Sequence, residues 1–107
     1  GTIPLTRNLK KKEIKGSYVK NTGKIIVESI QKRKINIKKI PAILVKSHGP
    51  FTMTDSAKKS LEVAIVLEEV AEMCFKSLTI SKKIKFNNFL LEKHFKRKNG
   101  PKKYYGQ

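Results

Sequence analysis

Few residues in this sequence are equipped for chemistry, and the two histidines, His48 and His94, are the first to consider. His48 follows the apolar run Ile43–Val45 and stands directly before Gly49-Pro50, where a strand should stop and the backbone turn. Glycine would give the backbone room for a sharp turn. A histidine at the end of a buried strand could project into a ligand-binding cleft of an open α/β layer. His48 is therefore either a metal ligand or catalytic residue, or an ordinary loop residue.

A single histidine cannot hold a catalytic zinc, which usually needs three protein ligands and an open position. The sequence contains no CxxC or HExxH motif and no recognisable nucleophile turn. Four glutamates, Glu62, Glu68, Glu69 and Glu72, gather in one segment with helical periodicity. Paired carboxylates could act as general acid and base. In so basic a chain we favour the other interpretation, that they pair with neighbouring lysines.

The charge balance is strongly positive, with 25 Lys+Arg against 8 Asp+Glu and a formal net charge of +17. Such a surface attracts phosphate on a nucleic acid, a membrane or a small metabolite. A solvated basic surface without a specific partner explains the same composition, and we favour it. A basic nucleic-acid-binding protein stays an alternative, although interleaved aromatics, zinc-finger spacing and a helix-turn-helix pattern are not evident.

Length and composition predict one small domain, because 107 residues suffice for one core and not for two. The single cysteine, Cys74, argues for a reducing compartment, so we expect a cytoplasmic protein. No apolar run is long enough to span a bilayer and no signal peptide is visible, so we expect no membrane association. The opening Gly1–Pro4 has no initiator methionine and looks like the middle of a longer protein.

The sequence of the first half of the chain predicts an extended segment and one helix. Thr2–Leu5 should be extended, because Pro4 is excluded from a helix interior. Asn21–Gly23 predicts a turn or the start of a helix. For Lys24–Lys34 we favour a helix over a strand, because its apolar spacing is helical and Glu28 and Lys32 form an i,i+4 pair.

The second half predicts a strand and two helices. Ala42–Ser47 is short, apolar and rich in β-branched residues, as in a strand covered on both faces. Thr54–Ser56 supplies N-cap candidates for the longest helix, whose broad apolar stripe over residues 61–78 predicts that it is mostly buried. Phe86–Lys98 predicts a last helix, which Asn99–Pro101 would end.

A resemblance to a known family rests on four stretches, in this order: GTIPLTR, PAILVKSHGPF, AIVLEEVAEM and KHFKRKNGPKKYYGQ. Together they resemble the C-terminal half of L-ribulose-5-phosphate 4-epimerase, in the class II aldolase/epimerase superfamily. The resemblance implies a three-layer α/β fold with a central sheet flanked by helices, of which residues 1–107 would be the C-terminal part. It also implies a homotetramer and a missing N-terminal half.

The resemblance further implies a zinc ion held by three histidines, a His-x-His pair upstream and His48. In such epimerases zinc stabilises the enediolate formed when the C3–C4 bond of L-ribulose 5-phosphate opens, and re-addition inverts C4 to give D-xylulose 5-phosphate. Tyr105 matches one proton-transfer group, and the other is an aspartate upstream of Gly1. His94 and Arg97 match residues of the same interface site. A sugar-phosphate aldolase of the same superfamily is an alternative.

Each of these residues also has a structural interpretation: Tyr105 could pack its ring in the tail, and His94 and Arg97 could be ordinary helix residues. Val19 stands where these epimerases carry a glutamate, Lys46 replaces a residue two positions before the zinc ligand, and Met53-Thr54 replaces Trp-Gly. With one zinc ligand of three and one proton-transfer group of two, we expect the chain to be inactive alone.

Overall fold

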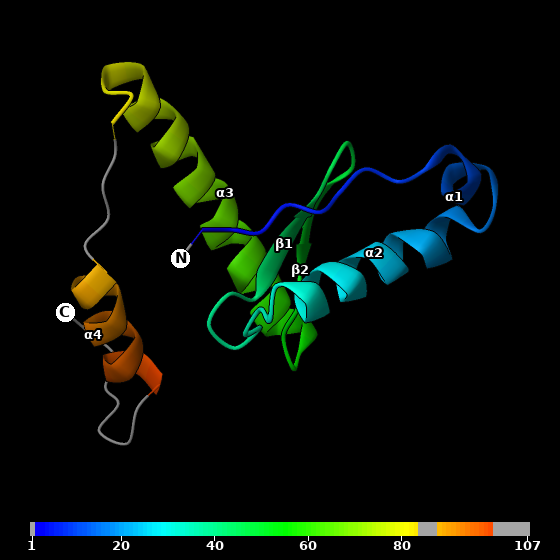
Figure 1. Ribbon diagram of the computed structural model, residues 1–107. Coiled ribbons are helices and arrows are strands. Elements are labelled where there is room, and N and C mark those ends of the chain that lie inside the picture. Colours follow the sequence, from blue (N-terminus) through cyan, green and yellow to red (C-terminus); the bar gives the residue numbers. More distant parts are fainter. Residues whose placement is uncertain (1, 84–87, 100–107) are drawn as a thin grey trace. The chain divides into compact units, whose positions relative to one another are not determined.

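A computed structural model describes residues 2–83 and 88–99 of the chain (Figure 1). It divides into two compact units, residues 2–71 and a unit that starts at Glu72. The described elements are, in order, α1 (Lys11–Lys15), α2 (Tyr18–Lys32), β1 (Ala42–Val45), β2 (Gly49–Thr52), α3 (Ala57–Ile80) and α4 (Asn88–Asn99). This mixture of helices and strands is compatible with the predicted α/β class.

The centre of the first unit is an antiparallel hairpin of β1 and β2, in which Ala42 pairs with Thr52 and Val45 with Gly49. The predicted strand is confirmed for its first four residues, but the chain turns at residues 46–48, earlier than expected. The sequence analysis missed β2, because its Gly49-Pro50 start is typical of a turn. Proline is tolerated there because the backbone groups of Leu44, its partner, bond away from β2.

The N-terminal segment lies along the other edge of β1, as its predicted extended form allows. Leu5 forms a parallel bridge with Leu44. The Leu44 amide donates to the Pro4 carbonyl at 2.8 Å, and the Thr6 amide donates to the Leu44 carbonyl at 2.9 Å. The Thr6 hydroxyl also accepts a hydrogen bond from the Lys46 amide at 3.1 Å. The segment therefore extends the hairpin by one further line of backbone pairing.

Helix α2 packs against β1 and supplies the other side of the small core. Its buried residues Thr22, Ile25 and Ser29 recur at steps of three and four, so they share one face. Ile25 is 1% exposed and Ile43 of β1 is 0% exposed. These two side chains pack with Ala42 and Val45, and Pro4 of the N-terminal segment is buried as well.

The predicted helix at Lys24–Lys34 is confirmed as far as Lys32, where α2 ends, and it starts earlier than predicted, at Tyr18. The prediction of a turn or helix start at Asn21–Gly23 is wrong, since these residues lie inside α2. Both polar side chains find partners within this helical path: the Asn21 side-chain amide donates to the Glu13 carbonyl at 2.9 Å, and the Thr22 hydroxyl donates to the Tyr18 carbonyl at 2.8 Å. Glycine inside a helix costs about 1 kcal/mol relative to alanine, an amount that packing of α2 can offset.

Helix α3 begins as predicted, because the Lys59 amide donates to the Ser56 hydroxyl at 3.3 Å. The prediction that it is mostly buried is wrong for the described residues: none of its residues is buried, and Leu61 is 62% exposed. Its apolar stripe needs cover on more than one side, and a sheet of two strands is too small to provide that. Of the four glutamates predicted to pair with lysines, Glu72 does so, with Lys76 at 2.8 Å. Among the described residues the other three form no ion pair, so the prediction holds for one glutamate of the four.

The last predicted helix is confirmed as α4, Asn88–Asn99. Phe86 and residues 100–107, which include the predicted helix end at Gly100-Pro101, lie outside the described residues. Among residues 2–83 and 88–99, no helix combines the length and the apolar character needed to cross a bilayer.

Candidate functional site

His48 is the last residue of the hairpin turn between β1 and β2. Its amide donates to the Val45 carbonyl at 3.0 Å, which closes the turn. Its imidazole lies 5.1 Å from the Phe51 ring, centroid to centroid, and 6.4 Å from the Tyr18 ring. The side chain is exposed. The prediction that His48 follows a buried strand at a turn is confirmed, and the turn presents its imidazole to solvent between two aromatic neighbours.

The backbone of this turn depends on two unusual conformations. Ser47 has φ 62° and Gly49 has φ 140°. The second value lies in a region that residues with a side chain rarely adopt, so glycine at 49 allows the chain to enter β2 directly after His48. A β-carbon at position 49 would meet no atom within 4 Å, so the constraint is the backbone conformation and not space.

Tyr18 was not expected at this site. It is the first residue of α2, thirty positions before His48 in the sequence, and its ring is tilted 27° from the imidazole. Phe51, by contrast, follows His48 closely enough that the hairpin alone brings the rings together. No local pattern signals the Tyr18 contact, because it depends on how α2 packs against the hairpin.

The described residues supply one possible zinc ligand, His48, and not the complete set that a zinc site needs. Within residues 2–83 and 88–99, no group of three or more His, Cys, Asp or Glu side chains could hold a metal ion. Val19, beside Tyr18, is 83% exposed and has no ligating atom. Lys46, in the same turn as His48, is exposed and adds a positive charge near the imidazole. A complete metal centre would therefore need ligands from elsewhere.

The other predicted site residues lie in the second unit or outside the described residues. His94 and Arg97 belong to α4, where His94 is exposed and Arg97 is partly exposed. Their i,i+3 spacing places them on one helical face, as predicted. Tyr105 lies outside the described residues. Their participation in a common site with His48 stays a prediction.

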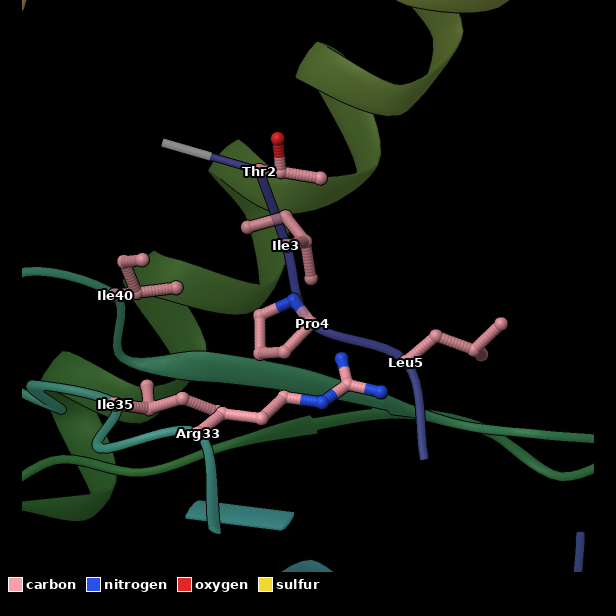
Figure 2. Close-up of a pocket in the computed structure, with 7 residues that line it drawn as sticks. All are labelled: Thr2, Ile3, Pro4, Leu5, Arg33, Ile35 and Ile40. Atoms are coloured by element: carbon pink, nitrogen blue, oxygen red, sulfur yellow. The ribbon is translucent and has the colours of Figure 1, made fainter. Parts of the chain in front are cut away.

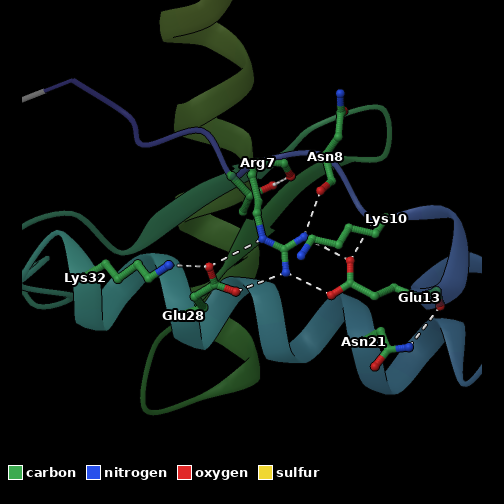
Figure 3. A network of polar contacts seen from close by, with 8 residues as sticks. Arg7, Asn8, Lys10, Glu13, Asn21, Glu28 and Lys32 are labelled. Carbon is green, nitrogen blue, oxygen red and sulfur yellow. Dashed lines mark hydrogen bonds and ion pairs between the residues drawn. The ribbon is translucent and has the colours of Figure 1, made fainter.

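A network around Arg7 fixes the elements that surround His48 (Figure 3). The Arg7 Nη1 and Nη2 atoms donate to the two carboxylate oxygens of Glu13 at 2.9 and 2.8 Å. Its Nε and Nη2 atoms donate to the Glu28 carboxylate at 3.4 and 3.1 Å. Lys32 also donates to Glu28, at 2.8 Å, so the predicted i,i+4 pair is confirmed. Arg7 thus ties the N-terminal segment to both α1 and α2.

These contacts change the acidity of both glutamates. Hydrogen bonds from Arg7 and from the Lys10 amide lower the pKa of Glu13 from 4.5 to about 2. Hydrogen bonds from Arg7 and Lys32 lower the pKa of Glu28 to about 2 as well. The same two carboxylates raise the pKa of Arg7. All three groups stay charged at neutral pH, and they link the N-terminal segment to α2, whose first residue, Tyr18, lies beside His48.

The geometry defines a small mixed α/β domain that presents the His48 imidazole on a hairpin turn. Residues 1–75 match the model of the class II aldolase and adducin N-terminal domain family, and the chain belongs to that family. Most members of this superfamily are enzymes, chiefly lyases and epimerases, and class II aldolases are typically zinc-dependent. The matched residues include His48 and the stretches GTIPLTR, PAILVKSHGPF and AIVLEEVAEM. KHFKRKNGPKKYYGQ lies beyond them.

Proposed function

We propose that the chain serves in the epimerisation of a sugar phosphate, the conversion of L-ribulose 5-phosphate to D-xylulose 5-phosphate. Membership of the class II aldolase family supports a sugar-phosphate aldolase or epimerase. The resemblance of the four stretches to L-ribulose-5-phosphate 4-epimerase supports the narrower choice. The observation that carries the proposal is the exposed His48 imidazole, set on the turn between β1 and β2 within the matched residues.

In this proposal His48 is one of three zinc ligands, and the remaining two come from a His-x-His pair that is not part of this sequence. When bound, zinc would supply Lewis-acid catalysis at the substrate's oxygen atoms. The rings of Phe51 and Tyr18 lie 5.1 and 6.4 Å from the imidazole, centroid to centroid, and in this proposal they would limit its orientations before a ligand arrives. This preorganisation reduces the entropy lost when the site assembles.

The protein also has to move protons while the C3–C4 bond of the substrate opens and re-forms on its other face. We assign one proton-transfer role to Tyr105, and the other to an aspartate outside this chain. A tyrosine with an ordinary pKa near 10 is a poor base at neutral pH, so neighbouring positive charge would have to stabilise its phenolate. His94 and Arg97 would complete the site at a boundary between subunits of a homotetramer.

The proposal includes the architecture that the assembled enzyme requires. The hairpin and its N-terminal neighbour would form part of the central sheet of a three-layer fold, with α2 and α3 among the flanking helices. The exposed apolar stripe of α3 supports this view, because additional strands or helices would cover it. A sugar-phosphate aldolase with the same site is the alternative, and the products of the reaction distinguish the two.

Complementation with the missing ligands tests the proposal. The full chain would be co-expressed with a segment of a class II epimerase that carries the His-x-His pair and the aspartate. The co-purified complex would be tested for zinc content and for D-xylulose 5-phosphate formation from L-ribulose 5-phosphate. We expect both to appear, and His48→Ala to lower activity at least about a hundredfold, since loss of groups that merely support metal ligands costs about 10–100-fold.

Lys46→Ala is the matched control, because Lys46 is exposed in the same turn and has no ligating role in the proposal. This variant should keep its zinc and most of its activity. Equal zinc content and activity in the two variants would refute the role of His48. Cleavage of the substrate to two smaller products, without epimerisation, would favour the aldolase.

A further inference from the structure

A pocket of about 360 Å³ lies at the opposite end of β1 from His48. Its lining comes from the N-terminal segment, the end of α2 and the connection to β1, and consists of Thr2, Ile3, Pro4, Leu5, Arg33, Ile35 and Ile40. Figure 2 shows the Arg33 side chain running along the pocket with its guanidinium toward Pro4 and Leu5. Apart from this group and Thr2, the lining side chains are apolar.

The charge of this region is one-sided. Residues 29–54 contain six Lys+Arg residues and no Asp or Glu. The nearest acid before this stretch, Glu28, is already paired with Arg7 and Lys32. Among the described residues, no ion pair involves the Arg33 guanidinium, which is exposed. A positive group without a partner at the wall of an apolar pocket favours a ligand that brings its own negative charge.

We propose that this pocket, the Arg33 pocket, binds a small molecule that carries one carboxylate on a short apolar body. The planar guanidinium can donate two parallel hydrogen bonds to a carboxylate. Ile3, Ile35 and Ile40 would cover the apolar body, as in ligand pockets that are mostly apolar with few polar groups. The neighbouring lysines add positive potential that attracts the anion without touching it.

The Arg33 pocket is independent of the proposed epimerase function. Ile40 stands just before β1, whereas His48 stands after the turn that ends it. Neither His48 nor its aromatic neighbours line the pocket. A carboxylate ligand here could therefore bind whether or not the metal site assembles.

Titration of the ¹⁵N-labelled full chain with hexanoate, followed by two-dimensional NMR, tests the inference. We expect saturable shifts in the amide signals of Ile3, Leu5, Ile35 and Ile40. Hexanol, which has the same body without the charge, should bind to the chain at least about tenfold more weakly than hexanoate. Arg33→Gln should bind hexanoate at least about tenfold more weakly than the unaltered chain, because a hydrogen bond to a charged group typically contributes that much.

Lys34→Gln is the matched control, since it removes the same charge from the next residue, which does not line the pocket. Its affinity for hexanoate should stay within about twofold of the unaltered chain, as expected for a screened, exposed charge. Three results would overturn the proposal: shifts spread over the whole chain, equal binding of hexanol, or equal losses in Arg33→Gln and Lys34→Gln.

Discussion

The guanidinium of Arg7 lies 3.1 Å from the carboxylate of Glu28, although 21 positions separate the two residues in the sequence. Arg7 belongs to the segment that pairs with β1, and Glu28 lies in the middle of α2. The same guanidinium also holds Glu13 of α1 at 2.8 Å. The Arg7 side chain therefore connects the N-terminal segment, α1 and α2. The strength of this connection depends on whether the carboxylates of Glu13 and Glu28 are ionised.

The first prediction is that stability falls in acid because of this network. The pKa values of Glu13 and Glu28 are lowered from 4.5 to about 2 in the folded chain. Since folding lowers them, the unfolded state binds more protons in this range, and the contribution is fully present above pH 4.5 and is lost as pH falls toward 2. Urea unfolding at a series of pH values measures the change.

Arg7→Gln should flatten this pH dependence, because it removes the group that contributes most to both shifts. Lys76→Gln, which breaks the exposed pair with Glu72, is the control and should leave the profile unchanged. A profile in Arg7→Gln as steep as that of the unaltered chain would contradict the assignment.

The second prediction compares the two apolar regions of the fold. Ile43 is fully buried in β1, so Ile43→Val should lower the free energy of unfolding by about 0.5–1.5 kcal/mol. Leu61 of α3 is 62% exposed, and Leu61→Ala should change stability by less than about 0.5 kcal/mol. Denaturant titration of both variants provides the test. A larger loss in Leu61→Ala would mean that α3 is covered in solution.

The features that the sequence predicted correctly are those that depend on interactions between residues close together in the sequence. The strand starting at Ala42, the helix around Ile25 and the pair of Glu28 with Lys32 depend on neighbours within a few positions, so periodicity predicted them. A turn near His48 was predicted because the apolar run Ile43–Val45 ends shortly before Gly49-Pro50, although the turn itself consists of residues 46–48 and Gly49-Pro50 begin β2. These features are enough to single out His48 as a candidate metal ligand before any tertiary structure is known.

The features that sequence reasoning missed depend on distant partners. Tyr18 reaches His48, and Arg7 reaches Glu28, only because α2 packs beside the hairpin. Strand β2 was missed because Pro50 usually excludes a central strand, whereas here it lies on an edge. For α3, the apolar stripe shows which face of the helix favours burial, but it does not show whether other elements of this chain pack against that face.

The third prediction concerns the aromatic contacts of His48. Tyr18→Ala should shift the NMR signals of the His48 imidazole protons, because the neighbouring ring current disappears. Tyr18→Phe keeps an aromatic ring at the same position and should shift them much less. If the two variants gave equal spectra at His48, the tyrosine ring would not lie beside the imidazole in solution.

The last prediction is that the chain by itself, supplied with zinc, produces no D-xylulose 5-phosphate from L-ribulose 5-phosphate. His48 offers one imidazole, and no three-ligand group occurs in the described part of the chain. A zinc ion held by one side chain keeps most of its positions for water and exchanges freely, so it cannot be held in a fixed place beside the substrate. A coupled assay for D-xylulose 5-phosphate, with an intact class II epimerase as positive control, measures the activity. Turnover that disappears in His48→Ala but persists in Lys46→Ala would contradict this prediction, because it would mean that the remaining ligands are supplied by this chain or by further copies of it.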